Sequence, residues 1–199
     1  MIPKVLDISE IVFPDLGVRQ LEDENAALKS TISVLRARIA ELETLADSDT
    51  LTPLPNRRFF LREMERAALQ VSRYGMSAAL LFVDVDSLKS INDSHGHCAG
   101  DLALIHIARL LRDQVRGSDV VARIGGDEFG ILLEHVDEAA ARDKAEALCQ
   151  VIADNPLVKG VPLSVSIGVA PLDEDHQAVL ARADGDMYCA KRAQARSDR

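Results

Sequence analysis

Two apolar runs of this chain, 119–124 and 129–133, are joined by Arg123-Ile124-Gly125-Gly126-Asp127-Glu128-Phe129. A glycine pair between two strand-like runs predicts a tight β-hairpin, and it leaves backbone uncovered where a ligand can approach closely. A hairpin by itself does not need acidic residues, so the adjacent carboxylates of Asp127 and Glu128 indicate a metal ion or a proton acceptor. A solvated turn that happens to be acidic is the alternative at this point.

A second acidic element follows the apolar run 78–83, which ends in Asp84-Val85-Asp86. The two aspartates alternate around Val85, so both side chains point to one face of the predicted strand. Mg2+ is typically bound by one or two carboxylates together with substrate phosphates. If this strand and the hairpin are neighbours in one sheet, Asp84 and Asp127 converge. Two metal ions there would hold the attacking and leaving oxygens of a phosphoryl or nucleotidyl transfer.

From about residue 49 to its C-terminus, the chain resembles the GGDEF domain of bacterial diguanylate cyclases, which condense two GTP into cyclic di-GMP and two pyrophosphates. Six stretches carry the resemblance in the family's order: 49–58, 84–93, 96–101, 123–129, 166–169 and 183–191. Each stretch is weak evidence alone, and the specificity comes from finding all six in that order.

The resemblance implies a role for each acid of these stretches. Asp84 and Asp127 look like the metal-binding carboxylates, with the backbone carbonyl of Val85 as a further ligand, for Mg2+ or alternatively Mn2+. Glu128 looks like the acid that helps to deprotonate the ribose 3′-hydroxyl, either as the base itself or by holding the metal. Asp101 resembles a residue that reads the guanine edge, because a carboxylate accepts from N–H groups that adenine does not offer.

The resemblance also implies a set of polar and cationic substrate contacts. Arg123 resembles the cation that stabilises developing phosphate charge, and the amide of Asn92 resembles a second reader of guanine. The remaining contacts that it implies are His97, Lys89, Gly125, Gly126 and Lys191.

Several of these residues have a structural alternative. Asn92-Asp93 and Gly100-Asp101 are also typical of turns and helix N-caps. His95, His97 and Cys98 could suggest zinc, but no second pair of ligands with suitable spacing accompanies them.

A regulatory motif is formed by Arg116 and Asp119, which resemble the RxxD site where dimers of the product bind and inhibit the enzyme. Arginine can stack on guanine and bind phosphate through two N–H groups, while aspartate reads the guanine edge. An ion pair that brackets the Gly-Ser turn is the alternative reading of so short a motif.

Three positions depart from the family's pattern. Pro53 replaces a glycine, Leu88 replaces a common phenylalanine, and Ala195 stands where an arginine usually contacts phosphate. The last departure favours a rival function, in which a degenerate domain binds cyclic di-GMP or GTP without catalysis. A purely structural coiled-coil adaptor would leave the acids unexplained.

The segment 18–48 carries a heptad repeat. Its a positions are Val18, Asn25, Ile32, Ile39 and Ala46, and its d positions are Leu21, Leu28, Leu35 and Leu42. Isoleucine at a, leucine at d and a single asparagine at a favour a parallel two-stranded coiled coil. We therefore expect a homodimer. A single amphipathic helix folded back on its own domain is the alternative.

Length and composition agree with a soluble cytoplasmic protein that has one domain plus an extension. The formal charge of −9 disfavours a nucleic-acid binder, and no run of 18 or more apolar residues predicts a membrane span. The three cysteines are odd in number and widely spaced, which indicates free thiols. Residues 1–17 form a short apolar segment, which is typical of a segment that docks on a protein partner or on the other chain of the dimer.

The remaining pattern predicts an α/β (α+β) domain over residues 49–199, with helices at 57–71, 99–115, 137–153 and 176–195 and strands at 77–84 and 163–170 beside the hairpin. The expected apolar side of the helix at 99–115 includes Leu102. The resemblance implies a central, mainly antiparallel sheet of about five strands flanked by helices, similar to the palm of class III nucleotidyl cyclases and polymerases.

Overall fold

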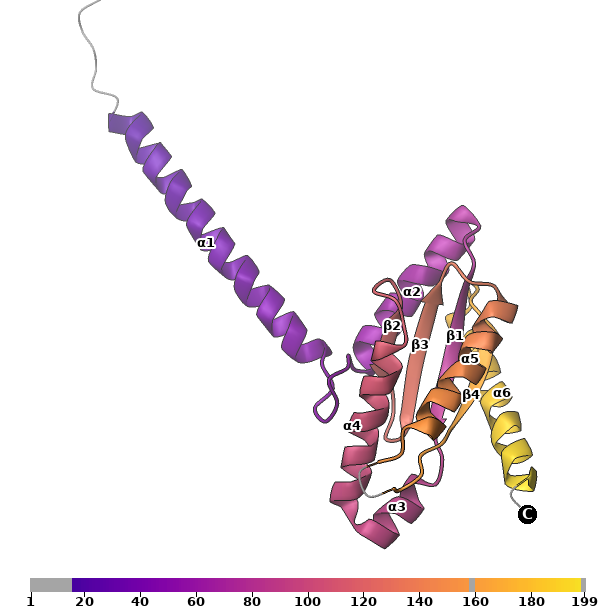
Figure 1. Ribbon diagram of the computed structural model, residues 1–199. Helices are drawn as coiled ribbons and strands as arrows, with labels where there is room; N and C mark the ends of the chain where they lie inside the picture. Colours follow the sequence, from indigo (N-terminus) through magenta and orange to yellow (C-terminus); the bar gives the residue numbers. More distant parts are fainter. Residues whose placement is uncertain (1–15, 158–159, 198–199) are drawn as a thin grey trace, which may run out of the picture. The chain divides into compact units, whose positions relative to one another are not determined.

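The computed structural model describes residues 16–157 and 160–197. The chain divides into two compact units between Ala46 and Asp47. The described part of the first unit belongs to one helix, α1 (Leu16–Asp47), whose last residue is the first of the second unit and which is drawn in indigo in Figure 1. Its 32 residues correspond to about 48 Å of helix. The long helix expected from the heptads is present, whereas residues 1–15, to which a partner contact is assigned above, lie outside the described residues.

The second unit is a twisted antiparallel sheet with helices on both faces. Its strands, in the spatial order β2-β3-β1-β4, are β1 (Ala78–Val85), β2 (Val120–Arg123), β3 (Glu128–Glu134) and β4 (Val165–Pro171). Its helices are α2 (Arg57–Tyr74), α3 (Leu88–His95), α4 (His97–Asp113), α5 (Glu138–Asp154) and α6 (His176–Ser197). None of the helices that the structure describes is long and apolar enough to cross a membrane.

The sheet has four strands in the described residues, so the expectation of about five is wrong. Beside β2, the segment before α2 makes only an isolated bridge, in which Arg123 donates its backbone N–H to the carbonyl of Pro55. Proline has no N–H to return, so pairing cannot continue there as a strand. Leu157 and Val161 likewise form only a single antiparallel bridge.

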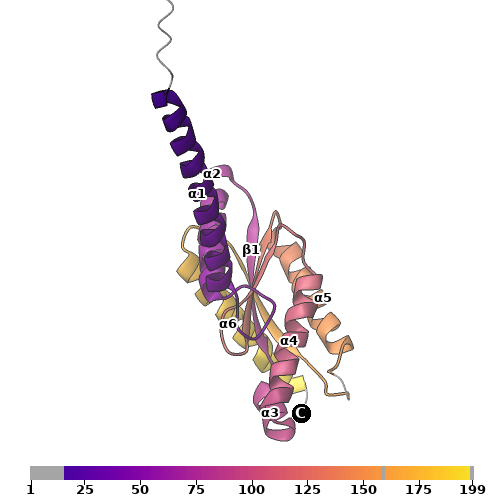
Figure 2. The same cartoon turned by 90° about the vertical axis from the view of Figure 1, so that its left-hand side faces the viewer.

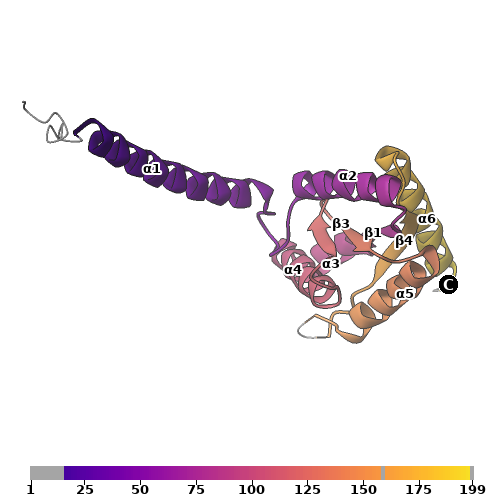
Figure 3. The ribbon, with the colours of Figure 1, turned by 90° about the horizontal axis from the view of Figure 1, so that it is seen from above.

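The sheet separates two hydrophobic clusters. Helices α2 and α6 cover one face and α4 and α5 cover the other, as Figure 2 and Figure 3 show. Because successive side chains of a strand point to opposite faces of the sheet, alternate residues of one strand belong to different clusters. Leu80 and Phe82 of β1 pack with the α2 and α6 cluster, whereas Leu81 and Val83 pack with the α4 and α5 cluster.

The local signals read from the sequence fix most elements. Asn56 caps α2 by accepting a hydrogen bond from the backbone N–H of Phe59, and α2 begins at residue 57, where the helix is expected. The helix expected to begin at residue 99 begins earlier, at His97, and Leu102 is exposed rather than on its apolar side. The short helix α3 was not anticipated, because its polar segment reads as a turn.

Candidate active site

Three acids meet where β1 ends and β3 begins. The antiparallel register places Asp84 directly opposite Glu128, and both side chains point to the face covered by α2 and α6. The backbone N–H of Val85 donates to the carbonyl of Asp127, with an N–O distance of 3.0 Å. This bond ties the end of β1 to the hairpin tip, so the predicted convergence of Asp84 and Asp127 on one place is supported by the register.

The electrostatics of these acids are those of a crowded anionic site. Burial raises the pKa of Asp84, the nearby Asp127 and Asp86 raise it further, and Lys191 opposes the rise. Burial also raises the pKa of Glu128, with contributions from Asp127 and Asp84, and Arg57 acts against them. Partly buried carboxylates that repel one another favour the binding of a cation.

The donor chemistry of this place suits a hard divalent cation. Two carboxylates, from Asp84 and Asp127, and the carbonyl of Val85 offer oxygen atoms only. The described residues contain no group of three or more His, Cys, Asp or Glu side chains arranged to hold a metal ion. A site of this kind would therefore complete its coordination with substrate phosphates and water, as Mg2+ sites commonly do.

The hairpin glycines differ in what surrounds them. A Cβ atom at Gly125 would collide with the carboxylate Oε2 of Glu128, so the side chain of Glu128 folds closely over the turn. A Cβ atom at Gly126 would meet no atom within 4 Å. Gly125 thus makes room for the Glu128 side chain, and Gly126 leaves backbone open to a ligand.

Lys191 lies at the carboxylate cluster. Its Nζ donates to Asp84 Oδ1 from α6, across 107 residues of sequence. The Lys191 side chain is 41 % exposed and that of Asp84 is 13 % exposed. The lysine therefore reaches a largely buried carboxylate from the solvent side, and the side chains of α6 from residue 193 on, including Ala195, lie outside the described residues.

The guanidinium of Arg123 is held by groups of its own chain. Its guanidinium donates to the carbonyl of Gly126, at 2.7 Å, and to Asp49 Oδ1, at 3.2 Å. Its Nε is buried without a hydrogen-bond partner in the described structure. The contact of Arg123 with substrate phosphate stays a prediction.

Arg57, Asp49 and Asp184 are site neighbours that sequence reasoning missed. Arg57 donates to the carbonyl of Ile124 at 3.2 Å. Arg57 and Asp184 also line, together with Glu128, a cavity of about 310 Å³ between α2 and α6. Their positions in the motifs 49–58 and 183–191 were the only available signal, because periodicity does not reveal which distant segments meet.

The residues expected to read guanine lie on the helix pair α3 and α4, just beyond the end of β1 (Figure 1). Asn92 Oδ1 is buried without a partner in the described structure, and a Cβ atom at Gly100 would collide with it. Asp101, beside Gly100, is exposed, as are His97 and Lys89. The turn and N-cap readings are wrong, because Asn92 lies within α3 and Asp101 is the fifth residue of α4.

The expected regulatory pair precedes β2, at the end of that strand away from the hairpin tip. Asp119 accepts hydrogen bonds from the backbone N–H groups of Arg116 and Glu134, at 2.9 and 3.2 Å. The contact between the two residues in the described structure uses the backbone N–H of Arg116 and not its exposed guanidinium, so the alternative of an Arg116–Asp119 ion pair is not what the structure contains. A cavity of about 480 Å³ lies here, lined also by Arg66 and Arg112.

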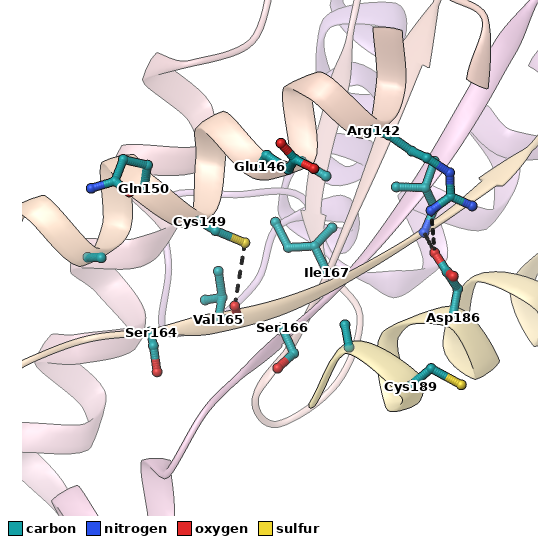
Figure 4. A pocket seen from close by; sticks show the side chains of 14 residues that line it. Arg142, Glu146, Cys149, Gln150, Ser164, Val165, Ser166, Ile167, Asp186 and Cys189 are labelled. Atoms are coloured by element: carbon teal, nitrogen blue, oxygen red, sulfur yellow. Dashed lines mark hydrogen bonds and ion pairs between the residues drawn. The ribbon is translucent and has the colours of Figure 1, made fainter. Parts of the chain in front are cut away.

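A further cavity, of about 820 Å³, is lined by none of the residues expected at the active site. It lies between α5, β4 and α6, as Figure 4 shows. Asp186, which pairs with Arg142, accepts the backbone N–H of Val169, and the thiol of Cys149 contacts the carbonyl of Val165. These contacts cover polar groups of the edge strand β4, which protects the edge from pairing with another chain.

Comparison with known proteins identifies the family. The family model described as diguanylate cyclase, GGDEF domain, matches residues 46–197. The diguanylate cyclase TpbB of Pseudomonas aeruginosa is 40 % identical over 200 residues, covering 94 % of this chain and 46 % of TpbB. The chain therefore spans about half the length of this curated relative.

Solved structures agree with this assignment. The coiled coil and GGDEF domain of DgcB from Caulobacter crescentus, in complex with c-di-GMP, has a TM-score of 0.76 at 25 % identity, over 87 % of this chain and 95 % of that one. The diguanylate cyclase SiaD of P. aeruginosa, in complex with its activator SiaC, has a TM-score of 0.76 at 29 % identity. The match covers 90 % of this chain and 71 % of that one. With the hairpin acids in place, the chain belongs to the GGDEF family of diguanylate cyclase domains.

Proposed function

We propose that this protein is a diguanylate cyclase that condenses two GTP into cyclic di-GMP and two pyrophosphates. The observation that carries the proposal is the meeting of Asp84, Asp127 and Glu128 at the end of the sheet, beside Lys191. A degenerate receptor would need none of these acids in this arrangement. The family and the 40 % identity with the diguanylate cyclase TpbB support the same activity.

In this proposal each domain binds one GTP, and two domains face each other. Asn92 and Asp101 hold the guanine, and the buried Oδ1 of Asn92 gains the donor that it lacks. Lys89, His97 and Lys191 contact the substrate, while Gly125 and Gly126 let the phosphates approach the backbone. The guanine is thus fixed at α3 and α4 while the triphosphate extends to the hairpin.

Asp84, Asp127 and the carbonyl of Val85 would hold Mg2+, with Mn2+ as an alternative. When bound, the metal neutralises phosphate charge and favours ionisation of the ribose 3′-hydroxyl. Glu128 accepts the proton of that hydroxyl, and the 3′-oxygen attacks the α-phosphorus of the other GTP. Pyrophosphate leaves. The 3′-oxygen of the second nucleotide then attacks the α-phosphorus of the first, which releases the second pyrophosphate and closes the ring. Arg123 would act by holding the hairpin in place or by contacting phosphate.

We further propose a parallel homodimer through α1. The d-position residues Leu21, Leu28, Leu35 and Leu42 and the a-position residues Ile32 and Ile39 are all exposed in the single chain. A row of large apolar side chains at heptad spacing is stabilised by a second helix. Tethering by this helix would raise the effective concentration of one catalytic domain near the other.

The proposed division of the chain is 1–17 as a short segment for a protein partner, 18–48 as the dimerisation helix and 49–199 as the catalytic domain. The protein would act in the cytoplasm. Product would inhibit it by binding at Arg116 and Asp119, beside the 480 Å³ cavity. Arg116→Ala should then weaken inhibition by added cyclic di-GMP at least tenfold, whereas Arg109→Ala, an exposed arginine on α4, should not.

The direct test is to incubate the purified protein, stripped of bound nucleotide, with GTP and Mg2+ and to resolve the nucleotides by anion-exchange chromatography. We expect cyclic di-GMP and pyrophosphate in a ratio of one to two. Glu128→Gln should abolish formation of the product. Glu146→Gln, which changes a residue that lines the 820 Å³ cavity, should still form it. Intact GTP together with tight binding of cyclic di-GMP would instead establish a receptor.

A further inference from the structure

The carboxylate of Asp84 has two partners in the proposed enzyme, the ammonium of Lys191 and a divalent cation. Lys191 Nζ lies 2.5 Å from Asp84 Oδ1, and Asp86 and Asp127 are close enough to act on the same ammonium. Asp84 is also one of the two carboxylates proposed above to hold the divalent cation. The ammonium of Lys191 therefore lies in direct contact with one of the proposed metal ligands.

A divalent cation and the ammonium cannot both lie at this carboxylate without cost. Two positive charges that share one ligand are only a few ångströms apart, and at that distance they repel each other even in a watery dielectric. The remaining anions of the site, Asp86 and Asp127, offset this repulsion only in part. The triphosphate of a nucleotide would offset it further, because its oxygens bind ammonium groups as well as metal ions.

Lys191 is able to change partners. It is 41 % exposed, and its flexible four-carbon side chain carries a compact charge with three donors. It sits on α6, close to the C-terminal end of the described chain, on the solvent side of Asp84. A modest rotation of the side chain would take the ammonium from the carboxylate to a phosphate bound in front of it.

We propose that Lys191 competes with the divalent cation for Asp84 and is transferred to the triphosphate when metal and nucleotide bind together. This inference rests on the proposed function. The ion pair keeps metal affinity low when no nucleotide is present, and nucleotide binding removes the competitor. Metal and nucleotide therefore bind with positive coupling, and the coupling is reciprocal.

The test measures Mn2+ binding without catalysis, by following the signal of free Mn2+ in electron paramagnetic resonance. In the absence of nucleotide, Lys191→Met should bind Mn2+ about three- to tenfold more tightly than the unmodified protein, because a competing charge has been removed. Lys191→Arg keeps the charge and should keep the weak affinity. Arg192→Met removes the next positive charge of α6, whose guanidinium lies over the Tyr188 ring, and should change Mn2+ affinity less than twofold.

The second arm adds a GTP analogue with a methylene bridge between the α and β phosphorus atoms, which cannot release pyrophosphate. The analogue should tighten Mn2+ binding strongly in the unmodified protein and much less in Lys191→Met. The proposal is overturned if, without nucleotide, Lys191→Met binds Mn2+ no more tightly than Arg192→Met does.

The two measurements distinguish a failure of this inference from a failure of the proposed function. If the unmodified protein makes no cyclic di-GMP but Lys191→Met binds Mn2+ more tightly, the exchange at Asp84 stands and the cyclase assignment fails. If cyclic di-GMP forms but the Mn2+ affinity of Lys191→Met is unchanged, the cyclase assignment stands and the exchange is wrong.

Discussion

Arg123 and Asp49 join the hairpin to the segment before α2. Arg123 Nη1 donates to Asp49 Oδ1 at 3.2 Å, and the two side chains are only 14 % and 15 % exposed. Asp49 also accepts hydrogen bonds from the backbone N–H and the hydroxyl of Thr52, both at 2.7 Å. Because Arg123 also binds the Gly126 carbonyl, the orientation of the acidic tip depends on a residue 74 positions earlier.

Breaking this pair should destabilise the domain. Asp49→Asn leaves the Arg123 guanidinium buried with its charge uncompensated, and removing one partner of a mostly buried ion pair costs about 3–5 kcal/mol. Asp173→Asn is the matched control, because Asp173 pairs with Arg182 but is half exposed, and exposed pairs contribute about 0–1 kcal/mol. Urea denaturation measures both. Equal losses for the two variants would contradict a special role for the buried pair.

The Asp49 pair should also show in the pH dependence of stability. Burial tends to raise the pKa of Asp49, but the hydrogen bonds from Thr52 and the charge of Arg123 outweigh burial and lower it. A carboxyl with a lowered pKa stabilises the fold above its unfolded pKa, near 3.8, and the stabilisation is lost as pH falls further. The stability difference between the unmodified protein and Asp49→Asn should therefore be constant from pH 5 to 7 and shrink below about pH 4.

Two glycine substitutions should separate activity from stability. Gly125→Ala places a Cβ atom against the flexible carboxylate of Glu128, which can move away, so we expect activity to fall at least about tenfold with little loss of stability. Gly168→Ala places a Cβ atom against backbone atoms of Ala183 and Met187, which cannot move cheaply, so we expect a large loss of stability. Thermal unfolding and cyclic di-GMP production, measured on both variants, test this contrast.

Removing the proposed base should stabilise the protein. The raised pKa of Glu128 means that its charged form is disfavoured in the folded state, by burial first and then by Asp127 and Asp84. At pH 7 the charge therefore opposes folding, and Glu128→Gln should raise the melting temperature while activity disappears. Glu146→Gln should leave the melting temperature nearly unchanged. A lower melting temperature for Glu128→Gln would show that Glu128 also has a stabilising contact.

The dimerisation helix can be tested with two residues that are both exposed in the single chain, Ile32 and Val34. Ile32 occupies an a position, whereas Val34 lies two residues later, off the seam. Ile32→Asp should convert the dimer to a monomer in light scattering, because a charge would be buried between the helices. Val34→Asp should remain dimeric. The same mass for both variants would exclude the proposed seam.

The three thiols should differ in reactivity. Burial raises the pKa of Cys149 to about 11, whereas Cys98 and Cys189 are exposed. Only the thiolate reacts with alkylating reagents, so Cys149 should be protected at pH 8 in the folded protein and become labelled in urea. Mass spectrometry after brief treatment with iodoacetamide reads each position. Labelling of Cys149 at the rate of Cys189 would show that the space between α5 and β4 opens in solution.

The elements that sequence reasoning found are those with strong local signals. The hairpin follows from its glycine pair, and the start of α2 follows from Asn56, a residue type that commonly caps helices, directly before Arg57. The helix α3 was missed because its 8 residues are mostly polar and have one buried side chain, Ile91. The residue pattern predicts the four strands that the structure contains, whereas the number of about five was implied by the family resemblance and is wrong for the described residues.

The sequence alone determined that this chain has a hairpin with two acids at its tip, a strand ending in Asp84 and a heptad helix before the domain. These features depend on neighbours in the chain, and patterns of two, three or seven residues report them. Only the tertiary structure decided that Asp84 faces Glu128, that Arg123 binds Asp49 and that Lys191 reaches Asp84. Those contacts join segments 44, 74 and 107 residues apart, and their formation depends on how the sheet and helices pack.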